Sequence, residues 1–195
     1  SSAASDVYKR QDRVLKLLDD ETKVAAIIAP SFPAEFPDIP DYHLLVGMIR
    51  SLGFKYISEV SFGADIVADK YKKLVNENKE YYISSDCPSI VNYIKFYHPA
   101  LAEKLAPIAS PMVAMGRVIH AKYGKDTKIV FIGPCVAKKA ESKEIDEVIT
   151  FTELRDLFVR KGISAEKSSP SEFDPPLGGR GAIFPVTRGL LQTAN

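Results

Sequence analysis

The sequence predicts an α/β domain with a mostly parallel sheet flanked by helices. Apolar, β-prone runs alternate with stretches of helical apolar spacing through most of the 195 residues, which is the pattern of strands connected by helices. Residues 23–29 and 129–132 are almost continuously apolar, which is typical of parallel strands buried on both faces. Pro30 and Pro134 stand just after these runs and end them.

The same patterns place the individual elements. Strands are expected at residues 23–29, 54–62, 81–84, 129–132 and 148–151. Helices are expected at residues 12–20, 41–52, 64–76, 89–97, 100–105, 110–122 and from 152 onward. Gly53 and Gly124 stand where two helices should end, and Ser110 is a capping residue before a proline. The proline-rich stretches 31–40 and 164–176 are expected to be loops.

Composition excludes several classes of function. The chain has 26 Lys and Arg against 25 Asp and Glu, so nothing indicates an electrostatic surface for nucleic acid or membranes. No apolar run approaches the roughly 18–20 residues of a membrane span. Two cysteines are too few for a disulfide scaffold, which makes a reducing, cytoplasmic setting the default.

Both ends of the chain carry signs of incomplete native sequence. Residues 6–11 resemble the translation of an adapter used in sequencing libraries, so residues 1–11 are expected to be an adapter-derived scar and residues 12–195 the domain. Residues 190–195 form a helix-compatible stretch without a cap or breaker. We therefore expect further native sequence beyond Asn195.

The two cysteines stand in similar positions. Cys87 and Cys135 each follow an expected strand beside a proline, and ligands of open α/β sheets bind outside the carboxyl ends of strands. Cys87 precedes a helix whose dipole favours a thiolate, and Lys138 and Lys139 favour negative charge beside Cys135. Thiolates select soft metals, usually zinc or iron–sulfur clusters.

The residues alone leave several alternatives open. No C-x-x-C pair is present. From the residues alone, two buried and unreactive cysteines explain the pattern about as well as a metal or redox site does. A thiol enzyme with a cysteine nucleophile lacks a convincing Cys–His pair, since His43, His98 and His120 are explained as helix-end or surface residues. The glycine-rich residues 178–181 lack the spacing of a nucleotide motif and indicate a plain turn.

Several spaced motifs resemble the iron-only ([FeFe]) hydrogenase large subunit. The resemblance runs from about residue 24 to residue 194, nearly the whole chain. The segments that carry it are APS at 29–31, SSDCPSIVNY at 84–93, YHP at 97–99, SP at 110–111, GPCVAKKAE at 133–141 and GAIF at 181–184. The resemblance implies one lobe plus part of the second lobe of a hydrogenase-like domain.

The cofactor that the resemblance implies is a 4Fe-4S cubane joined through a cysteine to a two-iron centre that carries carbon monoxide, cyanide and a bridging dithiolate. By this resemblance Cys87 and Cys135 are two of four cubane ligands, and a third motif beyond this chain supplies the other two. Lys138 would contact a cyanide through a charge-assisted bond. The other positions expected to bind the cofactor are Ala29, Pro30, Ser110, Met112 and Pro134, and of these Ala29 and Pro30 would line the pocket of the two-iron centre.

The chain departs from the family pattern at functional positions. Asp86 stands where efficient hydrogenases have a cysteine that relays protons, and a carboxyl group can also carry protons. Met112 replaces a glutamine, Gly133 replaces a methionine and is expected to loosen the pocket, and no acidic residue between Asp65 and Glu80 clearly matches the usual proton path.

These departures resemble the divergent, sensory-type branches of the family, whose members carry ferredoxin-like and PAS modules outside this region. The resemblance therefore implies interconversion of protons and H2, or H2 sensing with low turnover. The alternative is a non-enzymatic 4Fe-4S module for signalling or cluster assembly. A ferredoxin-like electron partner and a PAS or other signalling module are expected in the full-length protein.

Overall fold

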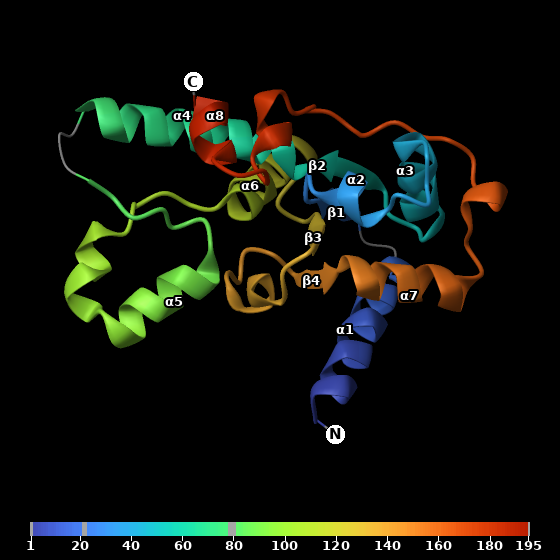
Figure 1. Cartoon of the computed structure of the whole chain (residues 1–195). Helices are drawn as coiled ribbons and strands as arrows, with labels where there is room; N and C mark the ends of the chain where they lie inside the picture. Colours follow the sequence, from blue (N-terminus) through green and yellow to red (C-terminus); the bar gives the residue numbers. More distant parts are fainter. Residues whose placement is uncertain (1, 21–22, 78–80, 195) are drawn as a thin grey trace.

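A four-stranded parallel sheet forms the centre of the computed structural model, which describes residues 2–20, 23–77 and 81–194 (Figure 1). The strands are β1 (Val24–Ile28), β2 (Tyr56–Glu59), β3 (Lys128–Gly133) and β4 (Glu147–Thr150). Their spatial order is β2-β1-β3-β4, and all neighbours run parallel. The predicted fold class is confirmed.

Burial explains why the central strands read as continuous apolar runs. All five residues of β1 are buried, and so are the last five of β3. Neither face of these strands meets solvent, so apolar side chains are favoured at every position rather than at every second one. The main hydrophobic core gathers around these two strands.

Eight α-helices and four 3₁₀ turns are present in the described part of the chain. The helices are α1 (Ser2–Asp19), α2 (Phe32–Glu35), α3 (Tyr42–Ser51), α4 (Val60–Glu77), α5 (Pro88–Tyr97), α6 (Pro111–Tyr123), α7 (Phe151–Lys161) and α8 (Gly189–Ala194). The 3₁₀ turns are η1 (Pro99–Lys104), η2 (Val136–Ala140), η3 (Ala165–Lys167) and η4 (Arg180–Ile183).

Helices cover the sheet on both sides. α6 packs on β1 and β3 and also against α4, and α8 packs on α4. α7 contacts β3 and β4, and α1 contacts β4 and α7. In Figure 1, α4 and α8 lie at the top of the view, whereas α7 lies level with β4 and α1 lies below both. The hairpin of α5 and η1 extends away from these layers.

Local sequence signals fix the helix ends. The Asp41 carboxylate accepts a hydrogen bond from the His43 amide, and the Ser110 hydroxyl accepts one from the Val113 amide. Thr150 and Glu153 form a capping box at the start of α7. Gly53 and Gly124 follow α3 and α6 with φ of 111° and 104°, a region that favours glycine.

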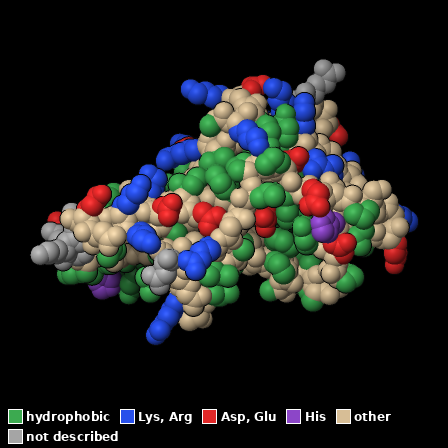
Figure 2. All heavy atoms as spheres, turned by 90° about the horizontal axis from the view of Figure 1, so that it is seen from above, with side chains coloured by type: hydrophobic (Ala, Val, Ile, Leu, Met, Phe, Trp, Pro, Cys, Tyr) green, Lys and Arg blue, Asp and Glu red, His purple; other side chains and the backbone are tan. Residues whose placement is uncertain are grey.

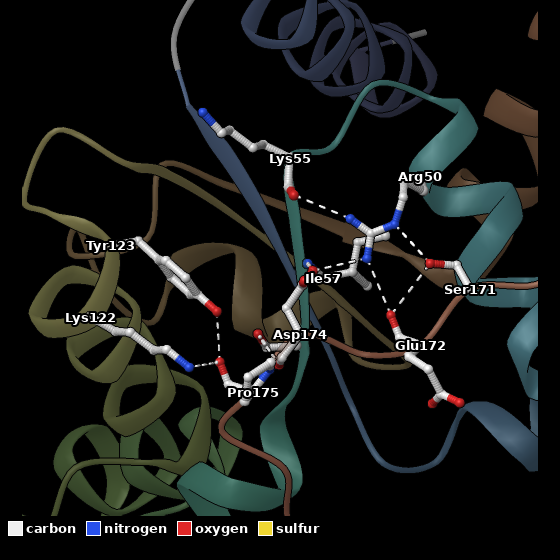
Figure 3. Close-up of polar contacts among 10 residues, drawn as sticks. Arg50, Lys55, Ile57, Lys122, Tyr123, Ser171, Glu172, Asp174 and Pro175 are labelled. Atoms are coloured by element: carbon white, nitrogen blue, oxygen red, sulfur yellow. Dashed lines mark hydrogen bonds and ion pairs between the residues drawn. The ribbon is translucent and has the colours of Figure 1, made fainter.

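The outer edge of β2 is covered by a loop that lies far away in sequence (Figure 3). Ile57 donates its amide to the Asp174 carboxylate (2.7 Å) and accepts a hydrogen bond from the Asp174 amide (2.7 Å). Arg50 donates to Asp174 at 2.9 Å and to Ser171 at 2.9 Å. Lys122 and Tyr123 both donate to the Pro175 carbonyl. The loop therefore replaces a fifth strand at this edge.

The prediction of a strand at residues 81–84 is wrong. Ile83 forms only an isolated bridge, with Leu105, and its amide and carbonyl bond to Lys104 and Ala106. Tyr81 is 71% exposed. The β-prone run thus pairs with a connecting segment of the α5–η1 hairpin instead of with the sheet, and Cys87 does not follow a sheet strand.

Smaller differences concern the ends of elements. β2 ends at Glu59 because α4 begins at Val60, within the predicted strand 54–62. The predicted loop 31–40 contains the short α2, and η1 is a 3₁₀ helix. None of the helices in the described ranges combines the length and apolar character needed to cross a membrane. Acidic and basic side chains are interspersed on the face shown in Figure 2.

Candidate functional site

A pocket of about 170 Å³ lies at the carboxyl ends of the two central strands. The chain leaves β1 toward β2 on one side and returns to β3 on the other, so strand order reverses between β1 and β3. This is the place where open α/β sheets bind ligands. Seven residues singled out from the sequence line it: Ala29, Pro30, Asp86, Met112, Pro134, Cys135 and Lys138.

Lys138 joins the two cysteine segments. Its ammonium group donates to the Asp86 carbonyl at 2.8 Å and pairs with the Glu141 carboxylate at 2.5 Å. Lys138 is three residues beyond Cys135, and Asp86 directly precedes Cys87. This bond therefore links the start of α5 to η2, and the two elements are in contact.

The two cysteines differ in exposure. Cys135 follows β3, is the N-cap residue of η2, is partly buried and lines the pocket. Cys87 is the N-cap residue of α5, as expected, but it is exposed and lies outside the lining of this pocket. Both are free thiols. The structure thus brings the Cys87 segment to the pocket rim, while Cys135 itself faces the pocket.

Asp86 presents a carboxyl group with unused bonding capacity. Its Oδ2 accepts a hydrogen bond from the Ser84 hydroxyl at 2.6 Å. Its Oδ1 is buried and has no hydrogen-bond partner among the described residues. Burial raises the pKa of Asp86, while the Ser84 hydroxyl and the Lys138 charge oppose this increase. The carboxyl group therefore holds a proton more readily than an ordinary aspartate.

Tyr71 of α4 lies behind this group, and its part in the site was not predicted. Its hydroxyl accepts the Ser85 amide at 2.9 Å and lies 3.4 Å from the Ser84 hydroxyl oxygen. These contacts join residues 14 and 13 positions apart, from segments that do not pair in a sheet. Helical spacing predicts only that Tyr71 faces inward.

Part of the pocket wall comes from residues after the glycine-rich turn. Phe184 and Pro185 line the pocket. The Asp65 carboxylate accepts the amides of Gly179 and Gly181, the first at 2.7 Å and the second at 2.5 Å, and so anchors η4 on α4. The turn at 178–181 therefore gives two of its amides to a carboxylate of the same chain.

Two departures from the family pattern have visible structural effects. Met112 is buried at the pocket, so an apolar side chain takes the place of a polar one. The expected loosening at Gly133 is not found, because a Cβ there would lie 2.5 Å from the Phe131 ring and 3.2 Å from the Ala29 Cβ. Phe131 fills this space. Ser110 is buried, and its hydroxyl caps α6.

The histidines serve other parts of the molecule. His43 pairs with Asp41 and Glu172, which raises its pKa, mainly through the Asp41 bond. His98 bonds to the Tyr93 hydroxyl, and His120 bonds to the Thr127 carbonyl. Within residues 2–20, 23–77 and 81–194, no group of three or more His, Cys, Asp or Glu side chains is placed to hold a metal ion.

Comparison with known proteins decides the family. Residues 22–195 match the model of the iron only hydrogenase large subunit, C-terminal domain. The chain belongs to this family. It is 30% identical to Iron hydrogenase 1 of Clostridium pasteurianum over 98% of its length. It is also 30% identical, over 54% of its length, to the cytosolic Fe-S cluster assembly factor NAR1 of Candida dubliniensis.

Solved hydrogenase structures share the fold. A variant of the [FeFe]-hydrogenase HydA1 from Chlamydomonas reinhardtii superposes with a TM-score of 0.80 at 24% identity, over 94% of this chain and 56% of that one. The HydA(deltaEFG) structure also gives a TM-score of 0.80 at 24% identity, over 95% of this chain and 56% of that one. The chain spans 39% of Iron hydrogenase 1 and 20% of NAR1. It is thus a partial iron-only hydrogenase domain.

Proposed function

We propose that the full-length protein binds a 4Fe-4S cluster in which Cys87 and Cys135 are two of the four thiolate ligands. The observation that carries this proposal is the Lys138–Asp86 bond, which brings both cysteine segments to one pocket at the strand ends. The donor set fits half of such a site, because both thiols are free and a cubane takes four cysteines. The other two ligands would come from sequence beyond this chain.

The pocket itself suits the two-iron centre of the hydrogenases. Its wall is apolar at Ala29, Pro30 and Met112, which would keep water away from the reacting atoms. The side chain of Lys138 is 14% exposed. Its positive charge would bind an anionic ligand of the centre. When bound, the centre supplies the redox chemistry of protons and H2.

Asp86 is the proton-carrying group of this proposal. Asp86 lines the pocket, its Oδ1 is buried without a hydrogen-bond partner among the described residues, and burial favours the protonated form of the carboxyl group. A proton held at this oxygen would be given to, or taken from, the reacting site, as in general acid–base catalysis. A carboxyl group is shaped differently from the thiol that it replaces, so we propose oxidoreductase activity with low turnover, as in an H2 sensor.

A second candidate function is a module for signalling or cluster assembly that holds only the cubane. The similarity to a cytosolic Fe-S cluster assembly factor over 54% of the chain favours it. Both candidates imply a reducing, cytoplasmic setting for the free thiols. We further propose a ferredoxin-like electron partner for the first candidate, and a PAS or other signalling module in the full-length chain.

The two candidates are separated by loading the full-length protein. It is reconstituted without oxygen with iron and sulfide, and then with a synthetic two-iron complex. Carbon monoxide and cyanide bands in the infrared spectrum support the first candidate. An intact cubane without these bands rejects it and leaves the second.

Cysteine variants test the ligand assignment. Cys87→Ala and Cys135→Ala are each expected to lose the cluster, because a missing thiolate leaves an iron site open. Iron content and the visible absorption of the cluster are the measurements. Unchanged iron in either variant would refute the ligand role of that cysteine.

A further inference from the structure

The turn that carries Cys135 and Lys138 is held from two sides. η2 has only five residues, too few for helical hydrogen bonds to stabilise it alone. Lys138 bonds toward the pocket, to Asp86. The next residue, Lys139, forms an ion pair with Glu153 at the start of α7. Adjacent residues of the turn thus reach opposite partners.

The Lys139–Glu153 pair is shielded from solvent. The two side chains are 15% and 4% exposed. Most lysine–carboxylate pairs lie at the surface, where they contribute little because water and salt screen them. A pair at this depth is screened much less. It can therefore hold a backbone segment in place, which a solvated pair does not do.

Glu153 is itself fixed by the α7 cap. One carboxylate oxygen accepts the Thr150 amide at 2.7 Å, the other pairs with Lys139, and the Glu153 carbonyl accepts a hydrogen bond from Gln11 at 3.1 Å. In the pairing of β3 with β4, Thr150 lies opposite Gly133. Gly133 is two residues before Cys135. The rigid capping box therefore lies directly beside the strand end from which the cysteine turn departs.

We propose that Lys139 and Glu153 are a positioning pair that sets the Cys135–Lys138 turn against the β4–α7 junction. Neither residue lines the pocket, so their role is to place two residues that do. This proposal depends on the proposed function only for the identity of the group that the turn binds. The placement of the turn is a property of the chain itself and is measured without any cluster.

The test is residue-resolved alkylation of the cluster-free chain. Cys87 and Cys135 lie in different tryptic peptides, so mass spectrometry follows the reaction of each with N-ethylmaleimide. The double variant Lys139→Met/Glu153→Gln removes both charges, and glutamine still accepts the Thr150 amide as in a capping box. Cys135 should react about tenfold faster, which corresponds to about 1.4 kcal/mol less stability of the closed turn. Cys87 is exposed, and its rate should stay within about twofold.

Matched variants make the result specific. Lys139→Arg keeps a cation at the pair and should react at a rate near that of the unmodified chain. Arg117→Met/Glu144→Gln removes a surface pair with two 2.8 Å contacts and should change neither cysteine. Glu153→Gln alone is the fallback if the double variant does not fold, with the same expected direction.

Three results would overturn the proposal. The first is an unchanged Cys135 rate in the double variant. The second is an equal rise at both cysteines, which shows general loosening. The third is a Lys139→Arg rate as high as that of the double variant, which shows that the charge does not hold the turn. None of these depends on cluster loading, so a failure of the proposed function, seen as missing iron, is distinguished from a failure of this inference.

Discussion

The two cysteine segments belong to regions of very different construction. Cys135 follows β3, and most residues of β3 are buried in the main hydrophobic core. Cys87 starts α5, in which only Pro88 and Ile94 are buried. The α5–η1 hairpin exposes large apolar side chains: Ile90, Tyr93, Phe96, Tyr97 and Leu101. One half of the proposed site is therefore built on a packed core and the other on a lightly attached hairpin.

This difference shows where the site is fixed and where it adapts. Regions with few buried contacts open at low free-energy cost, while core strands open only with the whole fold. The Lys138–Asp86 bond spans the two regions. We infer that the core determines the position of Cys135 and that the hairpin adjusts the position of Cys87.

The largest expected effect contrasts truncation in the core with truncation on the hairpin. Ile27→Ala in β1, at a fully buried position, should lower the free energy of unfolding by about 2–5 kcal/mol because it leaves a cavity. Phe96→Ala, at an 80% exposed position, should change it by less than about 0.5 kcal/mol. Urea titration followed by circular dichroism measures both. Similar losses in the two variants would contradict the contrast.

The next effect concerns the bond between the regions. Lys138→Met removes the donor to the Asp86 carbonyl, so the local opening free energy of residues 83–97 should fall by about 1.5–3 kcal/mol. Amide hydrogen exchange should accelerate there and stay unchanged in β1 and β3. The exposed Lys143→Met is a matched control. Equal exchange in residues 83–97 of Lys138→Met and the unmodified chain would show that other contacts hold the hairpin.

A smaller effect is expected at the core's own edge. Asp174→Asn keeps an oxygen that can accept the Ile57 amide but loses the ion pair with Arg50. The free energy of unfolding should drop by about 1 kcal/mol. Asp69→Asn, at an exposed position of α4, serves as the comparison in the same urea titration. A drop of equal size in both variants would mean that the Arg50–Asp174 pair adds nothing specific.

The smallest effect depends on pH. Burial raises the pKa of Glu59 above its ordinary 4.5, and the nearby Asp65 charge adds to this, against the Ser61 hydroxyl. The folded state thus holds this proton more tightly than the unfolded state, so the stabilisation is present below pH 4.5 and is lost as the pH rises through the raised pKa.

Glu59→Gln carries no such dependence. Its free energy of unfolding should exceed that of the unmodified chain at about pH 7 by less than about 1 kcal/mol, and the excess should vanish near pH 4. Unfolding curves of both proteins at the two pH values measure this. An excess that is the same at both pH values would contradict the assignment to Glu59.

The sequence predicts the core well because burial leaves a local signal. The continuous apolar runs identify β1 and β3, and the Ser110 cap marks the start of α6. The cap at Thr150 was not predicted, because Thr150 was placed in the strand expected at residues 148–151. The same reasoning fails at residues 81–84, where a β-prone run has a partner, Leu105, that lies outside the sheet. Strand propensity reports what a segment fits, not which segment it pairs with.

The candidate site divides in the same way. The residues that follow the central strands, among them Pro30 and Cys135, reach the pocket as expected. The Asp65 anchor of η4 joins residues more than a hundred positions apart, and no local pattern marks such a contact. The sequence likewise did not predict that the Phe131 ring occupies the space beside Gly133. Neighbours in space, which the local sequence does not specify, decide whether a glycine leaves a gap.

The loop that covers β2 has a consequence for self-association. An open strand edge offers unpaired amides and carbonyls to a strand of another molecule. At Ile57 both backbone groups are already bonded to Asp174. The sheet therefore does not grow past β2 by strand addition at this position, and molecules that meet on this side must recognise one another through side chains.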